Sequence, residues 1–238
     1  MKKYLIIGYA ILISYLPACQ GNEGRGSGKT DSTAQKREKR LEEAFQKRET
    51  NAKQLLEMND TLLIAALETE SVKGTEPFNV PAFSEVISRG DKIVPLLKLS
   101  LTKPGRSSLL SLLALRKLSN EVYRTVEPVF RSSVLIDAFK NSKYFNTWGL
   151  PHLYWEDAAK AIIELGKEIR PALIELLRDT TAAPVWGSEQ AVEYNIYKYR
   201  VCDYAMALIN EIDQKKAPIA TDVKIRDGII RSFLSDNG

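Results

Sequence analysis

The chain is poor in the residue types on which many metal and catalytic sites depend. Its 238 residues include one histidine and two cysteines. A single imidazole excludes a metal site built from several histidines, and a Ser-His-Asp triad would have to use His152. Two cysteines cannot form a disulfide framework, and Cys202 fits a small apolar residue buried in a helix better than a reactive thiol. We therefore expect neither a metal nor another cofactor.

The chain also lacks a strong net charge. Its 34 lysines and arginines against 30 acidic residues give +4 at pH 7, which is too little to indicate a nucleic acid as partner. No apolar run reaches the roughly 20 residues of a membrane-spanning helix. No alternating strand pattern of useful length occurs either, so the sequence predicts the all-α class.

The chain begins with the features of an export signal. Lys2 and Lys3 precede an apolar run from Tyr4 to Leu16, which is 13 residues long. A positive start followed by an apolar segment of this length is typical of a secretory signal peptide, which we expect to cover residues 1–18. A permanent transmembrane anchor is the weaker interpretation because the run is too short.

The end of this segment, Leu16-Pro17-Ala18-Cys19, resembles the bacterial lipobox, in which a cysteine receives a diacylglyceryl group and becomes the first mature residue. Pro17 departs from the small residue usual there, and ordinary secretory cleavage is the alternative. The resemblance implies lipid attachment at Cys19 and a place in the bacterial cell envelope. Gln20 after the cysteine leaves the outer-membrane route open, so we expect the outer membrane.

Beyond the cysteine, the sequence changes from a tether to a helical body. Residues 19–35 are rich in glycine, serine and charge, which predicts a flexible tether. We expect residues 36–238 to form one helical domain, beginning with a charged amphipathic helix over 34–57. Thr221 is the expected N-cap of a closing helix.

Two segments in the middle of the chain repeat one pattern. Gly90–Leu101 and Gly166–Leu177 share Gly, Ile, Pro and two Leu residues in register, with starts 76 residues apart. In each copy an apolar segment precedes the glycine, and the proline falls where the first turn of the next helix is expected. The spacing is about twice the period of HEAT-type repeats.

Asp157–Asp179 resembles a HEAT-like repeat of the PBS-lyase type, and the likeness extends less specifically over residues 81–213. This resemblance implies a short α-solenoid of helix pairs. In that family, an aspartate that closes one repeat and an arginine that opens the next help to join them, and Asp179 and Arg200 occupy these positions. We therefore expect a charge pair between the two at a repeat junction.

Residues 180–199 depart from the family pattern, because they form an insertion where the family has a short loop. The insertion is rich in aromatic residues, as is the segment before Asp157. Trp186, Tyr194 and Tyr197, together with Arg200, are our candidate binding surface, since amphipathic rings are common at recognition sites. The alternative is that the rings fill the fold where the repeat is irregular.

His152 raises a separate question of chemistry. His152 and Glu156 are one helical turn apart and could act together as ligands, with Asp157 adjacent. The segment also follows Pro151, where a helix is expected to begin, and acidic residues are stabilising at a helix N-terminus. We favour this structural role, and we identify no catalytic residue.

These features predict a membrane-tethered lipoprotein that acts as a protein-binding scaffold or adaptor. The resemblance to HEAT-like repeats implies a helical surface for protein contacts, so we expect an envelope protein as partner, with a glycan as a further possibility. One rival is an envelope enzyme acting on cell-wall material through carboxylates that converge only in three dimensions. A third interpretation is a purely structural protein. Fold analogy does not choose among these, because function belongs to sites.

Overall fold

The computed structural model describes residues 30–73, 77–215 and 217–237. The expected signal peptide, Cys19 and most of the expected tether lie outside these residues. The chain divides into two units, one ending at Arg48 and the other beginning at Glu49, and each is described by itself.

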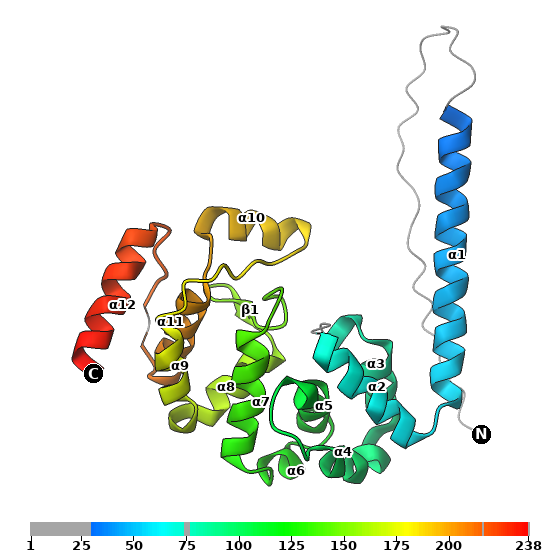
Figure 1. Cartoon of the computed structure of the whole chain (residues 1–238), viewed down its shortest axis with the longest axis horizontal. Helices are drawn as coiled ribbons and strands as arrows, with labels where there is room; N and C mark the ends of the chain where they lie inside the picture. Colours follow the sequence, from blue (N-terminus) through cyan, green and yellow to red (C-terminus); the bar gives the residue numbers. More distant parts are fainter. Residues whose placement is uncertain (1–29, 74–76, 216, 238) are drawn as a thin grey trace, which may run out of the picture. The chain divides into compact units, whose positions relative to one another are not determined.

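The described residues are mainly helical, so the predicted all-α class is confirmed. The α-helices are labelled in Figure 1. They are α1 (Thr30–Glu57), α2 (Asp60–Lys73), α3 (Pro81–Arg89), α4 (Val94–Ser100), α5 (Leu109–Leu118), α6 (Asn120–Arg124), α7 (Pro128–Lys140), α8 (Asp157–Leu165), α9 (Arg170–Leu176), α10 (Ser188–Tyr197), α11 (Val201–Ile212) and α12 (Val223–Asn237). Four short 3₁₀ segments are η1 (Pro77–Asn79), η2 (Gly90–Ile93), η3 (Arg106–Ser108) and η4 (Gly166–Glu168).

Both ends of the described chain differ slightly from the expected boundaries. Helix α1 begins at Thr30, so the last residues of the expected tether are helical. At the other end, the amide of Lys224 donates a hydrogen bond to the carboxylate of Asp222 (2.7 Å). Asp222 therefore caps α12, and Thr221 does not, because the helix starts one residue later than expected.

The repeated sequence pattern forms the same local structure twice. Gly90 follows the last residue of α3 and Gly166 follows the last residue of α8 as their C-cap residues, where φ is +64° and +57°. A short 3₁₀ turn follows each glycine, and a proline lies in the first turn of α4 and of α9. A Cβ at either glycine would meet nothing within 4 Å. Glycine is therefore required for its backbone conformation and not for space.

Helix α5 lies at the centre of the first half of the second unit. Residues 109–115, seven in succession, are buried. Helices α2, α3, α4, α6 and α7 all contact α5. A helix that is apolar on every side is expected where neighbours cover it all round, so α5 is the internal element of this part of the fold.

In the second half, α8 and α9 pack against α11 and a group of buried aromatic rings joins them to α7. Phe139 makes edge-to-face contacts with Phe145 and Trp148, at 5.2 and 4.9 Å between ring centroids. Tyr204 lies against Phe145 at 4.8 Å. The alternative that the aromatic residues fill the fold is therefore correct for Phe145 and Trp148, which are fully covered.

A two-residue ladder is the one sheet in the part of the chain that the structure describes. Strand β1 (Gly149–Leu150) pairs antiparallel with β2 (Tyr154–Trp155), and a three-residue turn carrying His152 joins them. The hydroxyl of Tyr204 in α11 donates to the carbonyl of Gly149 (2.9 Å), which fixes the hairpin to the core. Within the described ranges, no helix is long and apolar enough to cross a membrane.

A cleft around His152 as candidate functional site

A cleft of about 760 Å³ opens beside the β1–β2 turn, between that turn, the C-terminal end of α11 and the segment that follows it. We call it the His152 cleft. Its volume lies within the range of roughly 300–1,000 Å³ that ligand sites occupy. The lining combines aromatic, aliphatic and polar side chains: Pro151, His152, Leu153, Tyr154, Trp155, Tyr197, Ala207, Asn210, Glu211, Gln214, Lys215, Ala217, Pro218 and Ile219.

His152 is held by two residues of the insertion that are distant in sequence. Its Nδ1 lies 2.8 Å from the hydroxyl of Tyr199 and 2.9 Å from Oε1 of Glu193. The Tyr199 hydroxyl donates in turn to the same Glu193 oxygen (2.8 Å). The three groups form a closed triangle that joins the hairpin turn to α10.

The triangle determines which nitrogen of His152 carries a hydrogen. Burial raises the pKa of Tyr199 well above its usual value, and its hydrogen bond to Glu193 raises it further, so the hydroxyl stays protonated. Its single hydrogen goes to Glu193, and the Tyr199 oxygen is then an acceptor for Nδ1–H. Neutral His152 therefore has its hydrogen on Nδ1, and Nε2 is an acceptor. No described residue is hydrogen-bonded to Nε2.

Tyr197 completes the packing around the imidazole. Its ring stacks on Tyr199 at 5.1 Å, with 5° between the ring planes, and lies 4.7 Å from the ring of His152. Tyr197 also lines the cleft, whereas Tyr199 is fully buried. The imidazole is thus held by hydrogen bonds at one nitrogen and by an aromatic ring at its face.

The insertion over residues 180–199 has a defined structure, and it contains α10. Backbone hydrogen bonds tie it to the body at two points: the amide of Val201 donates to the carbonyl of Thr181 (2.9 Å), and the amide of Phe145 donates to the carbonyl of Pro184 (2.8 Å). The side chain of Asn146 bonds both the amide (2.9 Å) and the carbonyl (2.7 Å) of Trp186. These bonds hold α10 in the place from which Glu193 reaches His152.

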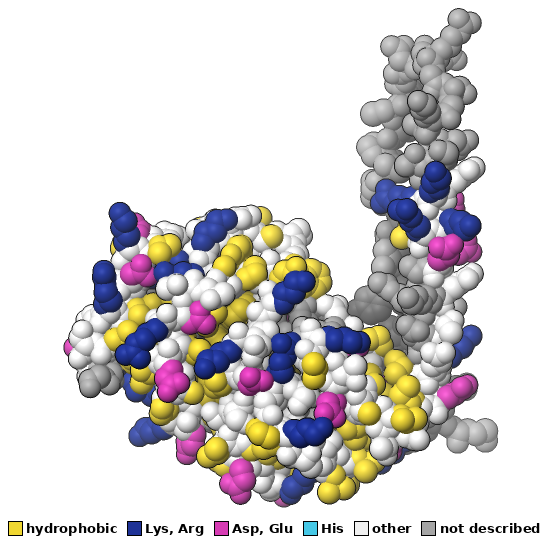
Figure 2. All heavy atoms as spheres, viewed as in Figure 1, with side chains coloured by type: hydrophobic (Ala, Val, Ile, Leu, Met, Phe, Trp, Pro, Cys, Tyr) yellow, Lys and Arg dark blue, Asp and Glu magenta, His cyan; other side chains and the backbone are white. Residues whose placement is uncertain are grey.

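The expected binding residues of the insertion differ in exposure. Trp186 is 45% exposed, while Tyr194 and Tyr197 are half-buried. On α10, Val192 and Ile196 are also exposed. Figure 2 shows hydrophobic side chains at the surface over α10 and α12. The structure therefore brings Tyr197 into the His152 cleft and leaves Trp186 outside its lining, and their part in binding stays a prediction.

The expected ion pair between Asp179 and Arg200 is wrong. The Arg200 guanidinium bonds Asp203 (2.9 and 3.1 Å) and Asp227 (2.8 Å). The Asp179 carboxylate instead accepts the amide of Thr181 (2.9 Å), although its backbone carbonyl does accept the amide of Cys202. Asp203 prevails because it lies one turn into α11, directly over the backbone of Arg200, whose amide it also accepts (3.0 Å).

Other chemistry considered from the sequence does not assemble at the His152 cleft. Glu156 does not approach His152 as a ligand; it is the N-cap residue of α8 and lines a different cavity. Burial raises the pKa of Cys202 to about 11, so this thiol is not a nucleophile at neutral pH. Among the described residues, no group of three or more His, Cys, Asp or Glu side chains is arranged to hold a metal ion.

Sequence reasoning missed Glu193 and Tyr199 as partners of His152. They are 41 and 47 residues further along the chain, and no local pattern links them. The available signal was indirect: a lone histidine and an aromatic-rich insertion in the same helical body. Comparison with protein-family models, with curated proteins and with solved structures finds no match to this chain.

Proposed function

We propose that this protein is a lipid-anchored scaffold or adaptor of the bacterial cell envelope, which binds a partner protein in the His152 cleft. The export signal and the lipobox-like Leu16–Cys19 support the location. Two or three acyl chains on Cys19 would hold the protein stably on a membrane, because each buried methylene contributes about 0.8 kcal/mol. Gln20 supports the outer membrane as the destination.

The body of this scaffold would be a short α-solenoid of HEAT-like helix pairs. The two copies of the Gly-x-x-Ile-x-Pro pattern, with their equivalent turns at Gly90 and Gly166, support this arrangement. So does the packing of α11 against both α8 and α9, since each repeat in a solenoid contacts its neighbour. The insertion that carries α10 then widens one edge of the solenoid into a binding site.

The lining of the His152 cleft favours an extended protein segment as ligand. Tyr154, Trp155 and Tyr197 contribute aromatic surface against which apolar side chains can pack. The amides of Asn210 and Gln214 each combine a donor and an acceptor, which is what a peptide backbone requires of its partner.

The observation that carries the proposal is the fixed imidazole of His152. Because Glu193, Tyr199 and Tyr197 already hold its position, a ligand that bonds Nε2 costs little additional ordering of the protein. The Nε2 acceptor suits a peptide N–H or a hydroxyl donor. Nothing comparable is required to close a helical core, so the arrangement supports a role in recognition.

The anchoring part of the proposal is tested by Cys19→Ala. We expect the variant to lack acyl groups and to appear in the soluble fraction after cell lysis, where the wild-type protein sediments with membranes. Mass spectrometry of the mature N-terminus provides the readout. An unmodified wild-type N-terminus at another residue would contradict lipid attachment.

The binding part is tested by crosslinking in intact envelopes, with the recovered partner then titrated against purified variants. We expect His152→Ala to weaken binding by about tenfold or more, because it removes a preorganised hydrogen bond. Trp186→Ala should weaken it by about 2 kcal/mol if its exposed ring is an aromatic hot spot. Val129→Ala, at an exposed position of α7 away from the cleft, is the matched control. Unchanged affinity in a folded His152→Ala variant would refute the assignment of the cleft, whatever the effect of Trp186→Ala.

A second candidate function is an envelope enzyme that acts on cell-wall material. The triangle of His152, Tyr199 and Glu193 favours it, because Nδ1–H is donated within the triangle and Nε2 is left as a general base for a water molecule. The 13% exposed Glu193 carboxylate is already bonded to Tyr199, so it serves to position His152. Release of fragments from purified cell wall by the wild type, but not by His152→Ala, would favour the enzyme over the scaffold.

A further inference from the structure

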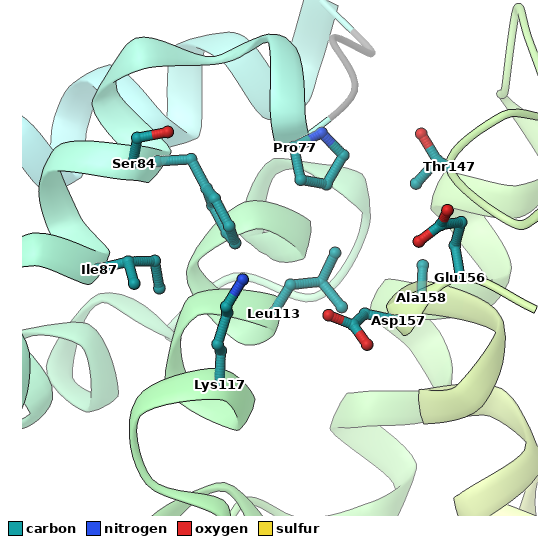
Figure 3. A pocket seen from close by; sticks show the side chains of 10 residues that line it. Pro77, Ser84, Ile87, Leu113, Lys117, Thr147, Glu156, Asp157 and Ala158 are labelled. Atoms are coloured by element: carbon teal, nitrogen blue, oxygen red, sulfur yellow. The ribbon is translucent and has the colours of Figure 1, made fainter. Parts of the chain in front are cut away.

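A second cavity, of about 400 Å³, lies apart from the His152 cleft and is lined by residues of η1, α3, α5 and the start of α8. We call it the Lys117 cavity. Its lining residues are Pro77, Phe83, Ser84, Ile87, Leu113, Lys117, Thr147, Glu156, Asp157 and Ala158. Figure 3 shows Leu113 on its floor between the Lys117 amine on one side and the two carboxylates on the other. The cavity therefore combines an apolar floor with charges of both signs.

Among the described residues that line this cavity, Lys117 is the one cation. The preceding residue, Arg116, is held by α8: its guanidinium donates to both oxygens of Glu164 (3.0 and 2.6 Å) and lies 3.6 Å from Asp157. Lys117 forms no ion pair with another described residue. Its amine points into the cavity in Figure 3.

Of the two carboxylates in the cavity, that of Glu156 has no cationic side chain beside it among the described residues. Asp157 lies within 4 Å of the cationic groups of both Arg116 (3.6 Å) and Lys160 (3.9 Å). Glu156 is half-buried, and within the described residues its carboxylate has no cationic partner. A half-buried carboxylate with no cationic side chain beside it can accept hydrogen bonds from the ammonium group of a ligand.

We propose that the Lys117 cavity binds a short apolar peptide with free termini, of about two residues, through charges at both ends. The amine of Lys117 receives the peptide carboxylate, and the Glu156 carboxylate receives the terminal ammonium. Phe83, Ile87 and Leu113 cover the apolar side chains in between. The volume is within the range of small-ligand sites, and a single charged group of either sign would leave one of the two protein charges unmatched.

This inference is independent of the His152 cleft and of the proposed scaffold function. The probe for it is the dipeptide Leu-Leu, titrated into the full-length protein and followed by calorimetry. We expect N-acetylation and C-terminal amidation of the peptide each to weaken binding by about tenfold, because each removes one charge-assisted contact. These comparisons use the wild-type protein, so they do not depend on the folding of any variant.

Two substitutions assign the contacts to residues. Lys117→Gln should weaken binding of Leu-Leu but leave binding of the amidated peptide unchanged. Glu156→Gln should weaken binding of Leu-Leu but leave binding of the acetylated peptide unchanged. Lys140→Gln and Glu175→Gln, at exposed positions of α7 and α9, are the matched controls. The proposal is overturned if Leu-Leu does not bind, if the blocked peptides bind equally well, or if both substitutions leave affinity unchanged in a folded protein.

Discussion

The ion-pair network of Asp203 permits the most quantitative prediction. The Asp203 side chain is 0% exposed, and its carboxylate accepts three hydrogen bonds from Arg200, one of them from the backbone amide. Nε of Arg226 lies 3.0 Å from the same carboxylate, at an angle that makes it an ion pair without a hydrogen bond. Asp203 thus pairs with two arginines at once, and its bond to Arg200 raises the pKa of that guanidinium.

Replacing Asp203 with alanine should destabilise the fold by about 3 kcal/mol, the lower end of the range for breaking a buried ion pair. The lower end applies because both arginines keep partners. Arg200 keeps Asp227, and the Arg226 guanidinium still donates to the carbonyls of Ala220, Thr221 and Tyr197. For a chain of this size, about 3 kcal/mol corresponds to a decrease of roughly 6–12 °C in Tm.

Asp179→Ala is the matched control, because the HEAT-like resemblance assigned the junction to Asp179. That carboxylate accepts one exposed backbone amide, so its loss should cost about 1 kcal/mol, or roughly 2–4 °C. Thermal melts followed by far-UV circular dichroism at pH 7 compare the two variants. Equal decreases in Tm, or a larger decrease for Asp179→Ala, would refute the reasoning.

Three further predictions concern stability and reactivity. The Arg170 guanidinium, which bonds both oxygens of Asp213 (3.0 and 3.1 Å), lowers the pKa of that carboxyl below its usual value. The stability that Asp213 contributes is therefore present above about pH 4 and is lost as pH falls through the lowered pKa of the folded state. The free energies of unfolding of wild type and Asp213→Asn, measured by urea titration, should converge only below about pH 4. Gly149→Ala should destabilise the fold by about 2 kcal/mol or more, because φ is +91° and a Cβ would lie 2.4 Å from a backbone oxygen of β2. Gly228→Ala, in the open interior of α12, should stabilise the fold by roughly 0.5–1 kcal/mol. Urea unfolding that ranks the two variants in the opposite order would contradict this. Cys202, buried and with its pKa raised to about 11, should resist maleimide at pH 7 until the protein is unfolded in guanidinium, and fast labelling of the native protein, mapped by mass spectrometry, would be the contrary result.

The local parts of the fold were predictable because their causes are local. Glycine at a helix end and proline in the first turn of the next helix predicted the turns at Gly90 and Gly166. The β1–β2 ladder was not predictable, because two-residue strands are too short to give an alternating pattern. Helix α10 was also missed, since its polar and apolar residues do not recur at a clear helical spacing.

The candidate site was predictable only in part, because its geometry is non-local. Tyr197 was identified from the composition of the insertion, and it does line the His152 cleft. Glu193 and Tyr199, the partners of His152, lie in the second half of that insertion. Glu156, one helical turn from His152 in sequence, was therefore considered in place of Glu193. For Arg200 the partner was local and was still missed. Asp203 is three residues away, at the spacing of a capping box at a helix N-terminus, but the family resemblance pointed to Asp179.

The most direct test of the proposed scaffold function is site-specific photocrosslinking from the His152 cleft in intact cells that produce the protein. A photoreactive residue at Leu153, which is exposed on the cleft wall, is compared with one at Val129, which is exposed on α7. We predict one protease-sensitive crosslinked partner from position 153 that is absent from position 129 and is lost when Tyr154→Ala removes a neighbouring ring. No crosslink from position 153, an equal one from position 129, or one that Tyr154→Ala leaves unchanged would contradict the proposal.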